Sequence, residues 1–460
     1  MKIRLHINNE NWFKPAIAVL ALTFLFISVW AFVRTSPGVD FYISWIGVMS
    51  VREQKCVNFY ETEKGVSLRE SFYKRSLEKT VPQRQKTVAQ CWQDYEKIFY
   101  KDLTPDNRLL FFFNTPFLYT CFQLFVGGDY ERDISLFYMF QLLCFISFII
   151  VYMHLLNFPF ASILYPAILF SVFFGPFLCD IRVGNVVLMQ LGFIALFLTC
   201  AHLVVKKDIG HLLGGAVLGL MVFFKPTMIF VPFMLLVGWL ALKQFRQAVL
   251  SFIGMIAGSV FAIFSASMFF STFSVWFWWF NSACNVSSLP YVTVDEGNFA
   301  LSRVLGEFCG FQKLSFIFLA VLLAIIISIA SSLGNKYFSK AHGNQEFSQS
   351  DNLLMISIGC LICLICAPLV WIHYYMLALP ALIYLARPVP AMQGARQTFI
   401  HFLAIMSYCS ICVAGRSDVT GLSLAVSAIL SSIGVICLLS CLLWIWHSEA
   451  SIKMKTKSDS

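Results

Sequence analysis

Residues 212–242 read LLGGAVLGLMVFFKPTMIFVPFMLLVGWLAL, and they contain one charged side chain, Lys225, which is followed at once by Pro226. Proline lacks the backbone N–H that a helix interior needs, so the stretch predicts two short apolar helices, at 212–224 and 228–242. Short or broken helices are tolerated in a lipid bilayer where they line a cavity. The stretch therefore predicts a membrane protein with a cation at a helix break.

The composition of the whole chain supports a membrane protein. Hydrophobic residues make up 59% of the sequence and charged residues 12%, and the mean hydropathy is +0.76. A soluble domain has about 45–50% apolar and about 25% charged residues, so the excess of apolar side chains must face lipid. The net charge of +9 lies mainly in short loops between apolar segments, where the positive-inside rule accounts for it. We therefore expect a membrane environment and no nucleic-acid partner.

Apolar segments recur along the chain at lengths that suit membrane helices, which need about 20 residues. The segment 109–126 is short and is interrupted by Asn114 and Pro116, which indicates a partly inserted or interfacial element. We predict an all-α, polytopic membrane protein with a bundle of about 11–13 transmembrane helices. Besides 212–224 and 228–242, the predicted spans are 15–33, 134–156, 158–178, 185–205, 248–270, 314–333, 352–370, 374–385, 398–413 and 421–446.

The basic residues of the short loops set the predicted orientation, because such residues are enriched in cytoplasmic loops. This rule places residues 1–14 and the tail 447–460 in the cytoplasm, and the tail is expected to be disordered. The segments 34–108 and 271–313 are then the two large loops of the outer face. Aromatic spacing in the first of these loops predicts helices that lie on the membrane surface. Residues 15–446 are expected to form a single membrane domain.

Four cysteines fall in the two predicted outer loops. Cys56 with Cys91, and Cys284 with Cys309, would each form a disulfide within a loop if that side of the membrane is oxidising. The cysteines that repeat every three residues from Cys360 lie within an apolar segment, where cysteine behaves as a small hydrophobic residue. We therefore expect no metal site.

Polar residues at membrane depth are costly and call for an explanation. Asp40 directly follows the first predicted span, where partial burial would raise its pKa toward that of a general base; the alternative is a solvated acid that ends a helix. Lys225 would bind a lipid phosphate, or it would extend its charge to the membrane surface. Asn114-Thr115-Pro116 would form either a simple turn or the wall of a groove.

Three further positions have the same two kinds of explanation. Arg182 or Asn185 would bind phosphate or sugar hydroxyl groups, or Arg182 would simply pair with Asp180 at the interface. Asn298 and Arg303 would close over a substrate, or they would be ordinary surface residues. His373 would bind a phosphate or assist proton transfer, or it would belong to an interfacial belt of aromatic residues.

These candidates share one predicted face of the membrane. One acid together with several cations and a histidine suits a phosphate-bearing lipid and a hydroxyl acceptor. The sequence contains no Walker motif, GxSxG or HExxH, which argues against an ATP-driven pump or a common hydrolase.

Six motifs, in order, resemble glycosyltransferase family 87, whose GT-C-class members use polyprenyl-phosphate mannose. They open with Asp40-Phe41-Tyr42 after the first predicted span and end with Trp371-Ile372-His373-Tyr374. Where the family has an aromatic-Pro-Pro sequence this chain has Asn114-Thr115-Pro116, and Asn185 replaces a glutamine. Between the first and last motifs lie Phe113-Asn114-Thr115-Pro116-Phe117, Gly184-Asn185-Val186-Val187, Gly214–Leu220 leading to Lys225-Pro226, and Gly297-Asn298-Phe299-Ala300-Leu301.

The resemblance implies a GT-C-like catalytic domain at 15–446 in the plasma or inner membrane, with its active site on the outer face. It implies an inverting hexosyltransferase that moves a sugar, usually mannose, from a polyprenyl-phosphate donor to a lipid or glycan acceptor without a further cofactor. Asp40 would be the catalytic base, and Lys225 and His373 would lie near the donor phosphate. Two alternatives remain open: a transporter or flippase of a lipid-linked sugar, and a non-catalytic subunit of an envelope assembly complex.

Overall fold

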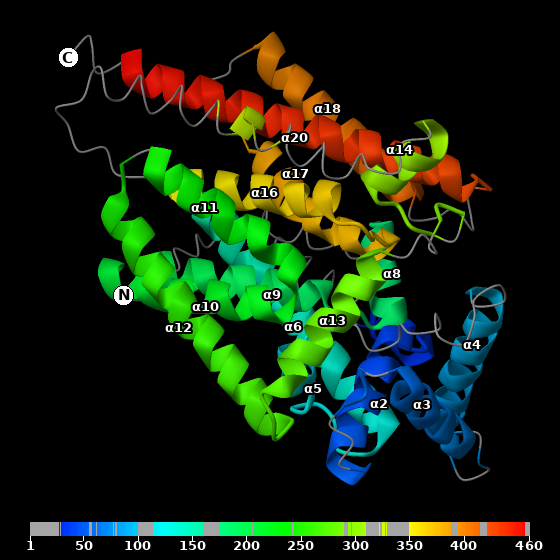
Figure 1. Ribbon diagram of the computed structural model, residues 1–460. Coiled ribbons are helices and arrows are strands. Elements are labelled where there is room, and N and C mark those ends of the chain that lie inside the picture. The colour runs from blue at the N-terminus through cyan, green and yellow to red at the C-terminus, as the bar shows by residue number, and fades with distance from the viewer. Residues whose placement is uncertain are drawn as a thin grey trace, which may run out of the picture.

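The computed structural model of the protein is built from helices (Figure 1). Every regular element in the described part of the chain is helical, which confirms the predicted all-α class. The structure describes residues 29–54, 58–76, 81–99, 114–159, 174–204, 206–241, 243–288, 293–309, 349–387, 394–414 and 421–455, with gaps at 61 and 296 and a few isolated positions elsewhere.

Five described helices are long and apolar enough to cross a membrane, or six if a bent pair counts as one span. They identify a multi-pass helical membrane protein, as predicted. Most of the predicted spans 15–33, 158–178 and 314–333 lies outside the described residues, so the larger count of spans stays a prediction. The five helices are α6 (Tyr130–Leu155), α10 (Lys207–Phe224), α12 (Phe245–Phe269), α16 (Gln349–Cys366) and α20 (Leu424–Lys455).

The bent pair consists of α8 (Gly175–Val183) and α9 (Val187–Leu198), which continues into the π-helix η3 (Thr199–Val204). The two helices meet at an angle of 109°. Gly184 ends α8 in the left-handed conformation, which glycine adopts without a steric penalty. The break therefore places Gly184 and the residue after it at the corner between two helices.

The predicted break at Lys225 is present. Helix α10 ends at Phe224, and the 3₁₀ helix η4 (Pro226–Ile229) leads into α11 (Phe230–Ala241). Helix α10 starts at Lys207, five residues before the predicted start at 212, because the apolar pattern does not mark its polar first turn. A second 3₁₀ helix, η5 (Ile372–Ala378), leads into α17 (Leu379–Leu385).

Glycines let α10 and α12 pack backbone to backbone. A Cβ atom added at Gly215 would lie 2.1 Å from the Ser251 carbonyl oxygen, and one at Gly258 would lie 2.0 Å from that of Ala216. Membrane helices gain their association energy from such close packing of small residues, since lipid is as apolar as their side chains. This contact fixes the end of α10 that leads to Lys225.

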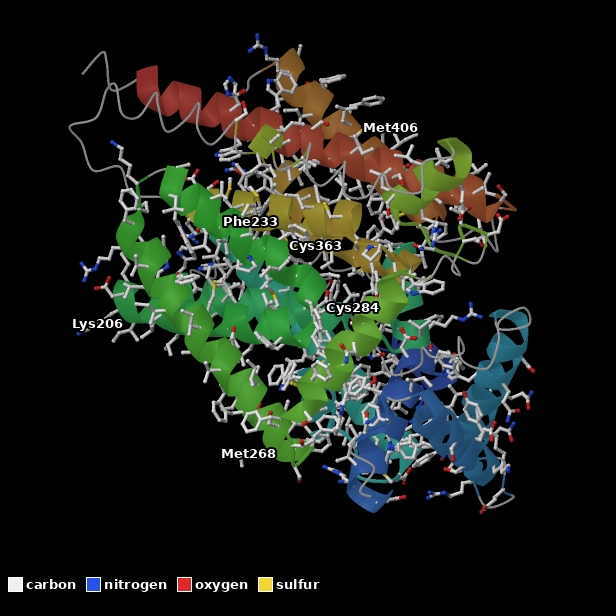
Figure 2. The ribbon with its side chains drawn as sticks, viewed as in Figure 1. Lys206, Phe233, Met268, Cys284, Cys363 and Met406 are labelled. Carbon is white, nitrogen blue, oxygen red and sulfur yellow. The ribbon has the colours of Figure 1, made fainter. Side chains whose placement is uncertain are left out.

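The predicted first outer loop is helical, as expected. Figure 1 shows its three helices grouped at the lower right of the molecule. In Figure 2, Lys206 lies at the left edge, away from this group, and its assignment to the cytoplasmic side stays a prediction. The three helices are α2 (Val39–Gln54), α3 (Thr62–Ser76) and α4 (Gln83–Phe99).

The remaining helices belong to loops and to the C-terminal pair. Helix α20 continues through Lys455, so residues 447–455 are helical where a disordered tail was expected. Helix α20 packs along α18, at the top of Figure 1. The other elements are α5 (Pro116–Phe122), α13 (Ser274–Ser288), α14 (Leu301–Cys309) and α18 (Ala395–Ala414).

The cysteine predictions have different outcomes. Cys91 is an exposed free thiol, which contradicts the disulfide with Cys56, a residue outside the described part. The side chain of Cys309 is also outside the described part, so its pairing with Cys284 stays a prediction. Cys363 lies inside the bundle on α16, which packs against α11, the helix of Phe233 (Figure 2).

Candidate functional site

Asp40 lies in the first turn of α2, where the chain docks on the end of α8. The Gly38 N–H donates to the Arg182 carbonyl oxygen at 3.2 Å. At Gly184, a Cβ atom would lie 3.0 Å from the Phe41 Cβ and 3.3 Å from the Gly38 Cα. Because both glycines have positive φ and no side chain, the two backbones approach closely and bring Asp40 to the corner between α8 and α9.

Helix α4 holds this turn from the other side. The Arg84 guanidinium donates to the Ser36 carbonyl oxygen at 2.7 Å and to the Val33 carbonyl oxygen at 2.6 Å. The Trp92 indole N–H donates to the Val39 carbonyl oxygen at 2.8 Å. These bonds fix the backbone on the N-terminal side of Asp40, so the predicted first outer loop supports the candidate base.

Asn185 is the direct partner of Asp40. Its side-chain nitrogen Nδ2 donates to Asp40 Oδ2, while its oxygen Oδ1 accepts the Val186 N–H at 2.7 Å. The second bond fixes which end of the amide faces the carboxylate. Burial raises the pKa of Asp40 above its ordinary value, and the Asn185 hydrogen bond and the Lys225 charge oppose this rise. Asp40 is therefore a carboxylate with enhanced basicity, as a general base requires.

Lys225 stands at the break between α10 and η4. Its ammonium group donates to the Tyr374 hydroxyl at 3.2 Å and lies 5.3 Å from the centre of the Tyr374 ring. Its charge acts on both Asp40 and His373. The structure thus places Lys225 within electrostatic reach of the candidate base Asp40, which precedes it in the sequence, and of His373, which follows it.

His373 lies in η5 and is 5% exposed. Burial, assisted by the Lys225 charge, lowers the pKa of His373 to about 3, so the imidazole is neutral at neutral pH. Its Nε2 atom is buried and has no hydrogen-bond partner among the described residues. A neutral imidazole can still donate one hydrogen bond to a phosphate, so the positive charge of the site resides on Lys225.

Asn298 has a structural role next to His373. Its amide donates to the Pro368 carbonyl oxygen at 3.2 Å and accepts the N–H groups of Ala300 at 3.0 Å and Val370 at 3.1 Å. These bonds tie the chain before α14 to the segment that enters η5. The predicted contact of Asn298 with substrate stays a prediction, whereas its support of the His373 segment is observed.

The motif Asn114-Thr115-Pro116 caps a helix. The Thr115 hydroxyl oxygen accepts the Leu118 N–H at 3.1 Å at the start of α5, and the hydroxyl donates to the Phe224 carbonyl oxygen at 3.2 Å. Thr115 therefore connects α5 to the last residue of α10, directly before Lys225. This contact gives the motif a positioning role that neither sequence interpretation included.

The two predicted arginines are placed differently. The side chain of Arg182 is exposed and that of Arg303, on α14, is half-buried. Within the described part of the chain, neither makes an ion pair or side-chain hydrogen bond with Asp40, Lys225 or His373. Their predicted contact with substrate stays a prediction.

Three buried polar residues near Asp40 were not predicted as site residues. One of the two sequence interpretations paired Asp180 with Arg182, but Asp180 is fully buried and its carboxyl oxygens make no hydrogen bond of normal geometry in the described part. Tyr138 and Gln141 lie in α6, and the Gln141 amide donates to the Asn185 carbonyl oxygen. A sequence signal existed, because the two polar side chains lie three residues apart, on one face of a predicted span.

The described residues contain no group of three or more His, Cys, Asp or Glu side chains that could hold a metal ion. The predicted site residues that the structure groups together supply the partly buried carboxylate of Asp40, the ammonium group of Lys225 and the neutral imidazole of His373. Comparisons with protein-family models, with curated proteins and with solved structures found no match for this chain.

Proposed function

We propose that the protein is an inverting membrane glycosyltransferase, a hexosyltransferase and specifically a mannosyltransferase of the GT-C type. It moves the sugar of a polyprenyl-phosphate donor to a lipid or glycan acceptor on the outer face of the plasma or inner membrane. The proposed fold is a GT-C-like bundle of about 11–13 spans. The observation that carries the proposal is the grouping of Asp40 with Asn185, Lys225 and His373, which come from four separate parts of the chain.

The grouping suits one displacement reaction at the anomeric carbon. Asp40 takes the proton of the acceptor hydroxyl as the acceptor oxygen forms its bond to that carbon. The bond from the anomeric carbon to the phosphate oxygen breaks, and its electron pair stays with the phosphate. Because phosphate leaves without protonation, one carboxylate is sufficient, in contrast to the carboxylate pair of glycoside hydrolases.

Lys225 and His373 stabilise the leaving group. Lys225 provides the positive charge for the phosphate, and the His373 imidazole provides a neutral donor. Both groups come from short 3₁₀ breaks that precede the apolar helices α11 and α17, an arrangement that suits a phosphate carried on a membrane lipid. A donor already anchored in the bilayer needs no nucleotide pocket.

Aromatic side chains beside Lys225 suit an isoprenoid chain. The Phe223 ring, two residues before Lys225, contacts the Trp276 ring of α13 at 5.3 Å between centroids. The Trp276 indole N–H donates to the Ile263 carbonyl oxygen on α12 at 3.3 Å. The Phe223 and Trp276 rings thus form apolar surface between Lys225, the proposed phosphate ligand, and α12. Helix α12 exposes large hydrophobic side chains such as Phe261 and Phe264.

The test compares Asp40→Asn with wild-type protein in proteoliposomes. The donor is a short polyprenyl-phosphate mannose labelled in its sugar, and the acceptors are lipids extracted from a strain that lacks the protein. We expect wild-type protein to transfer label and Asp40→Asn to lose at least about 100-fold of the rate, the usual contribution of a general base. Asp129→Asn is the matched control, because Asn caps helix α6 as well as Asp does.

Two results would contradict the proposal. Undiminished transfer by Asp40→Asn would show that Asp40 is not the catalytic base. Movement of labelled donor across the bilayer without product formation would favour the transporter, which needs no base.

A further inference from the structure

The fold alone does not explain the buried carboxyl group of Asp180. Asp180 is 0% exposed, and neither of its carboxyl oxygens makes a hydrogen bond of normal geometry within the described part of the chain. Arg182, the cation nearest to it in sequence, has an exposed side chain instead. A buried carboxyl group without a partner is costly, so its presence calls for a functional explanation.

Asp180 is connected to Asp40 through Asn185. The Asp180 backbone carbonyl accepts the N–H groups of Gly184 at 2.9 Å and Asn185 at 3.2 Å. The Asn185 side chain in turn donates to the Asp40 carboxylate. The carboxyl groups of Asp180 and Asp40 are close enough to interact electrostatically, so the site contains two coupled carboxyl groups.

Two side chains of α6 complete this buried polar region. The Tyr138 hydroxyl is buried without a hydrogen-bond partner of normal geometry, and it interacts electrostatically with both Asp40 and Asp180. It lies 3.3 Å from the position that a Cβ atom of Gly38 would take. The Gln141 Oε1 atom, one helical turn further, is also buried without a partner. Enclosed polar groups of this kind commonly share an ordered water molecule.

We infer that Asp180 accepts the acceptor proton from Asp40, through the Tyr138 hydroxyl or an ordered water molecule, and so restores the base for the next cycle. The inference rests on the proposed function. The proton that leaves the acceptor hydroxyl moves to Asp40, then to Asp180, and finally to solvent, with no change in oxidation state. In the proposed reaction, donor and acceptor occupy the accessible side of Asp40, so the proton must leave through the buried side chains around Asp40.

The surroundings of Asp180 suit this exchange. Burial and the charge of Asp40 favour the protonated form of Asp180, so a proton that reaches Asp40 is drawn toward Asp180; the N–H groups of Val187 and Leu188, at the start of α9, only partly oppose this. The other charged groups that face the pair are Lys225, which acts on Asp40, and Arg84, which acts on Tyr138. Lys225 favours the Asp40 carboxylate, and repulsion between Asp40 and Asp180 is relieved when the two carboxyl groups share one proton.

The test separates the first turnover from the steady state, with the labelled polyprenyl-phosphate mannose and extracted acceptor lipids in proteoliposomes. In Asp180→Asn, Asp40 starts deprotonated, so we expect the first turnover within about threefold of wild type. Steady-state turnover should fall about tenfold or more, with a larger solvent deuterium isotope effect and an unchanged KM for the donor. Tyr138→Phe keeps the ring and tests the same path independently.

Tyr152→Phe is the matched control, because Tyr152 lies on the same helix, about 21 Å further along, with its hydroxyl bonded to Leu353 and Ser357. It should retain both rates. Equal slowing of both phases in Asp180→Asn, or wild-type steady-state rates in both Asp180→Asn and Tyr138→Phe, would overturn the inference. Product formation by Asp40→Asn would instead overturn the proposed function, so the two failures are distinguishable.

Discussion

The amide of Asn185 donates a hydrogen bond to the carboxylate of Asp40 across 145 residues of sequence. Burial raises the pKa of Asp40, and this bond is the larger of two interactions that oppose the rise. Asn185 thus limits the rise in the pKa of Asp40. The carboxylate stays basic enough to accept a proton but is not protonated before the reaction starts.

Asn185→Ala should move the acidic limb of the pH–rate profile to higher pH. Removal of the hydrogen bond raises the pKa of Asp40 further, and only the deprotonated carboxylate acts as a base. Since a hydrogen bond to a charged group contributes about 1.5–3 kcal/mol, the limb should move by about 1–2 pH units. The measurement is kcat/KM between pH 5 and 9. A lower rate with an unmoved limb would mean that Asn185 does not tune Asp40.

Lys225→Gln should weaken binding of the donor phosphate. Loss of a charge-assisted bond to phosphate is expected to cost about 1.5–3 kcal/mol, or about 10- to 100-fold in affinity. The change also raises the pKa of both Asp40 and His373, because Lys225 lowers both. Competition by farnesyl phosphate against the labelled donor measures the effect.

The matched control for this change is Lys206→Gln, at an exposed lysine that lies at the left edge of the molecule in Figure 2. Its affinity for farnesyl phosphate should equal that of wild type. Equal affinities of wild type and Lys225→Gln would exclude Lys225 from the phosphate site.

Gly184→Ala should reduce both stability and activity. At φ +69° an alanine is strained, and its Cβ atom would also press on Phe41 and on Gly38, which hold the start of α2. Gly421→Ala is a close control, because Gly421 has φ +68° with nothing within 4 Å of the added Cβ atom. Both changes should carry the backbone cost of about 1–3 kcal/mol, but only Gly184→Ala should displace Asp40.

Thermal midpoints in detergent and transfer rates separate these two costs. We expect similar backbone strain in the two variants and a loss of transfer confined to Gly184→Ala. Equal activity of both variants would show that the contact between α2 and α8 does not position the base.

Local patterns in the sequence were sufficient to predict most of the described helices and some residues of the candidate site. Pro226 and the apolar residues around it determine the break at Lys225, because a missing N–H acts locally. Asp40 stood out because an acid next to a long apolar segment is costly wherever the chain folds. Such signals depend on neighbouring residues, so they can be read before the tertiary contacts are known.

Contacts between distant segments could not be read in this way. The amide of Asn298 meets Val370, 72 residues further along, and this contact makes Asn298 a structural support for the His373 segment. Asp180 and Arg182 are two residues apart, which suggested a pair, but the turn of a helix over two residues directs their side chains to different sides. Asp180 is consequently buried and Arg182 exposed.

Gly258→Ala should separate α10 from α12 and so disturb Lys225 from a distance. The added Cβ atom would lie 2.0 Å from the Ala216 carbonyl oxygen, and backbone atoms cannot rotate away as a side chain can. Overpacking of this kind costs about 1–3 kcal/mol or more.

Gly434→Ala is the control, because its Cβ atom would lie 3.2 Å from the Ser407 carbonyl oxygen, a distance that a small shift relieves. Gly258→Ala should therefore show the lower thermal midpoint and the weaker competition by farnesyl phosphate, since α10 ends directly before Lys225. A wild-type midpoint for Gly258→Ala would contradict the close backbone packing of α10 against α12.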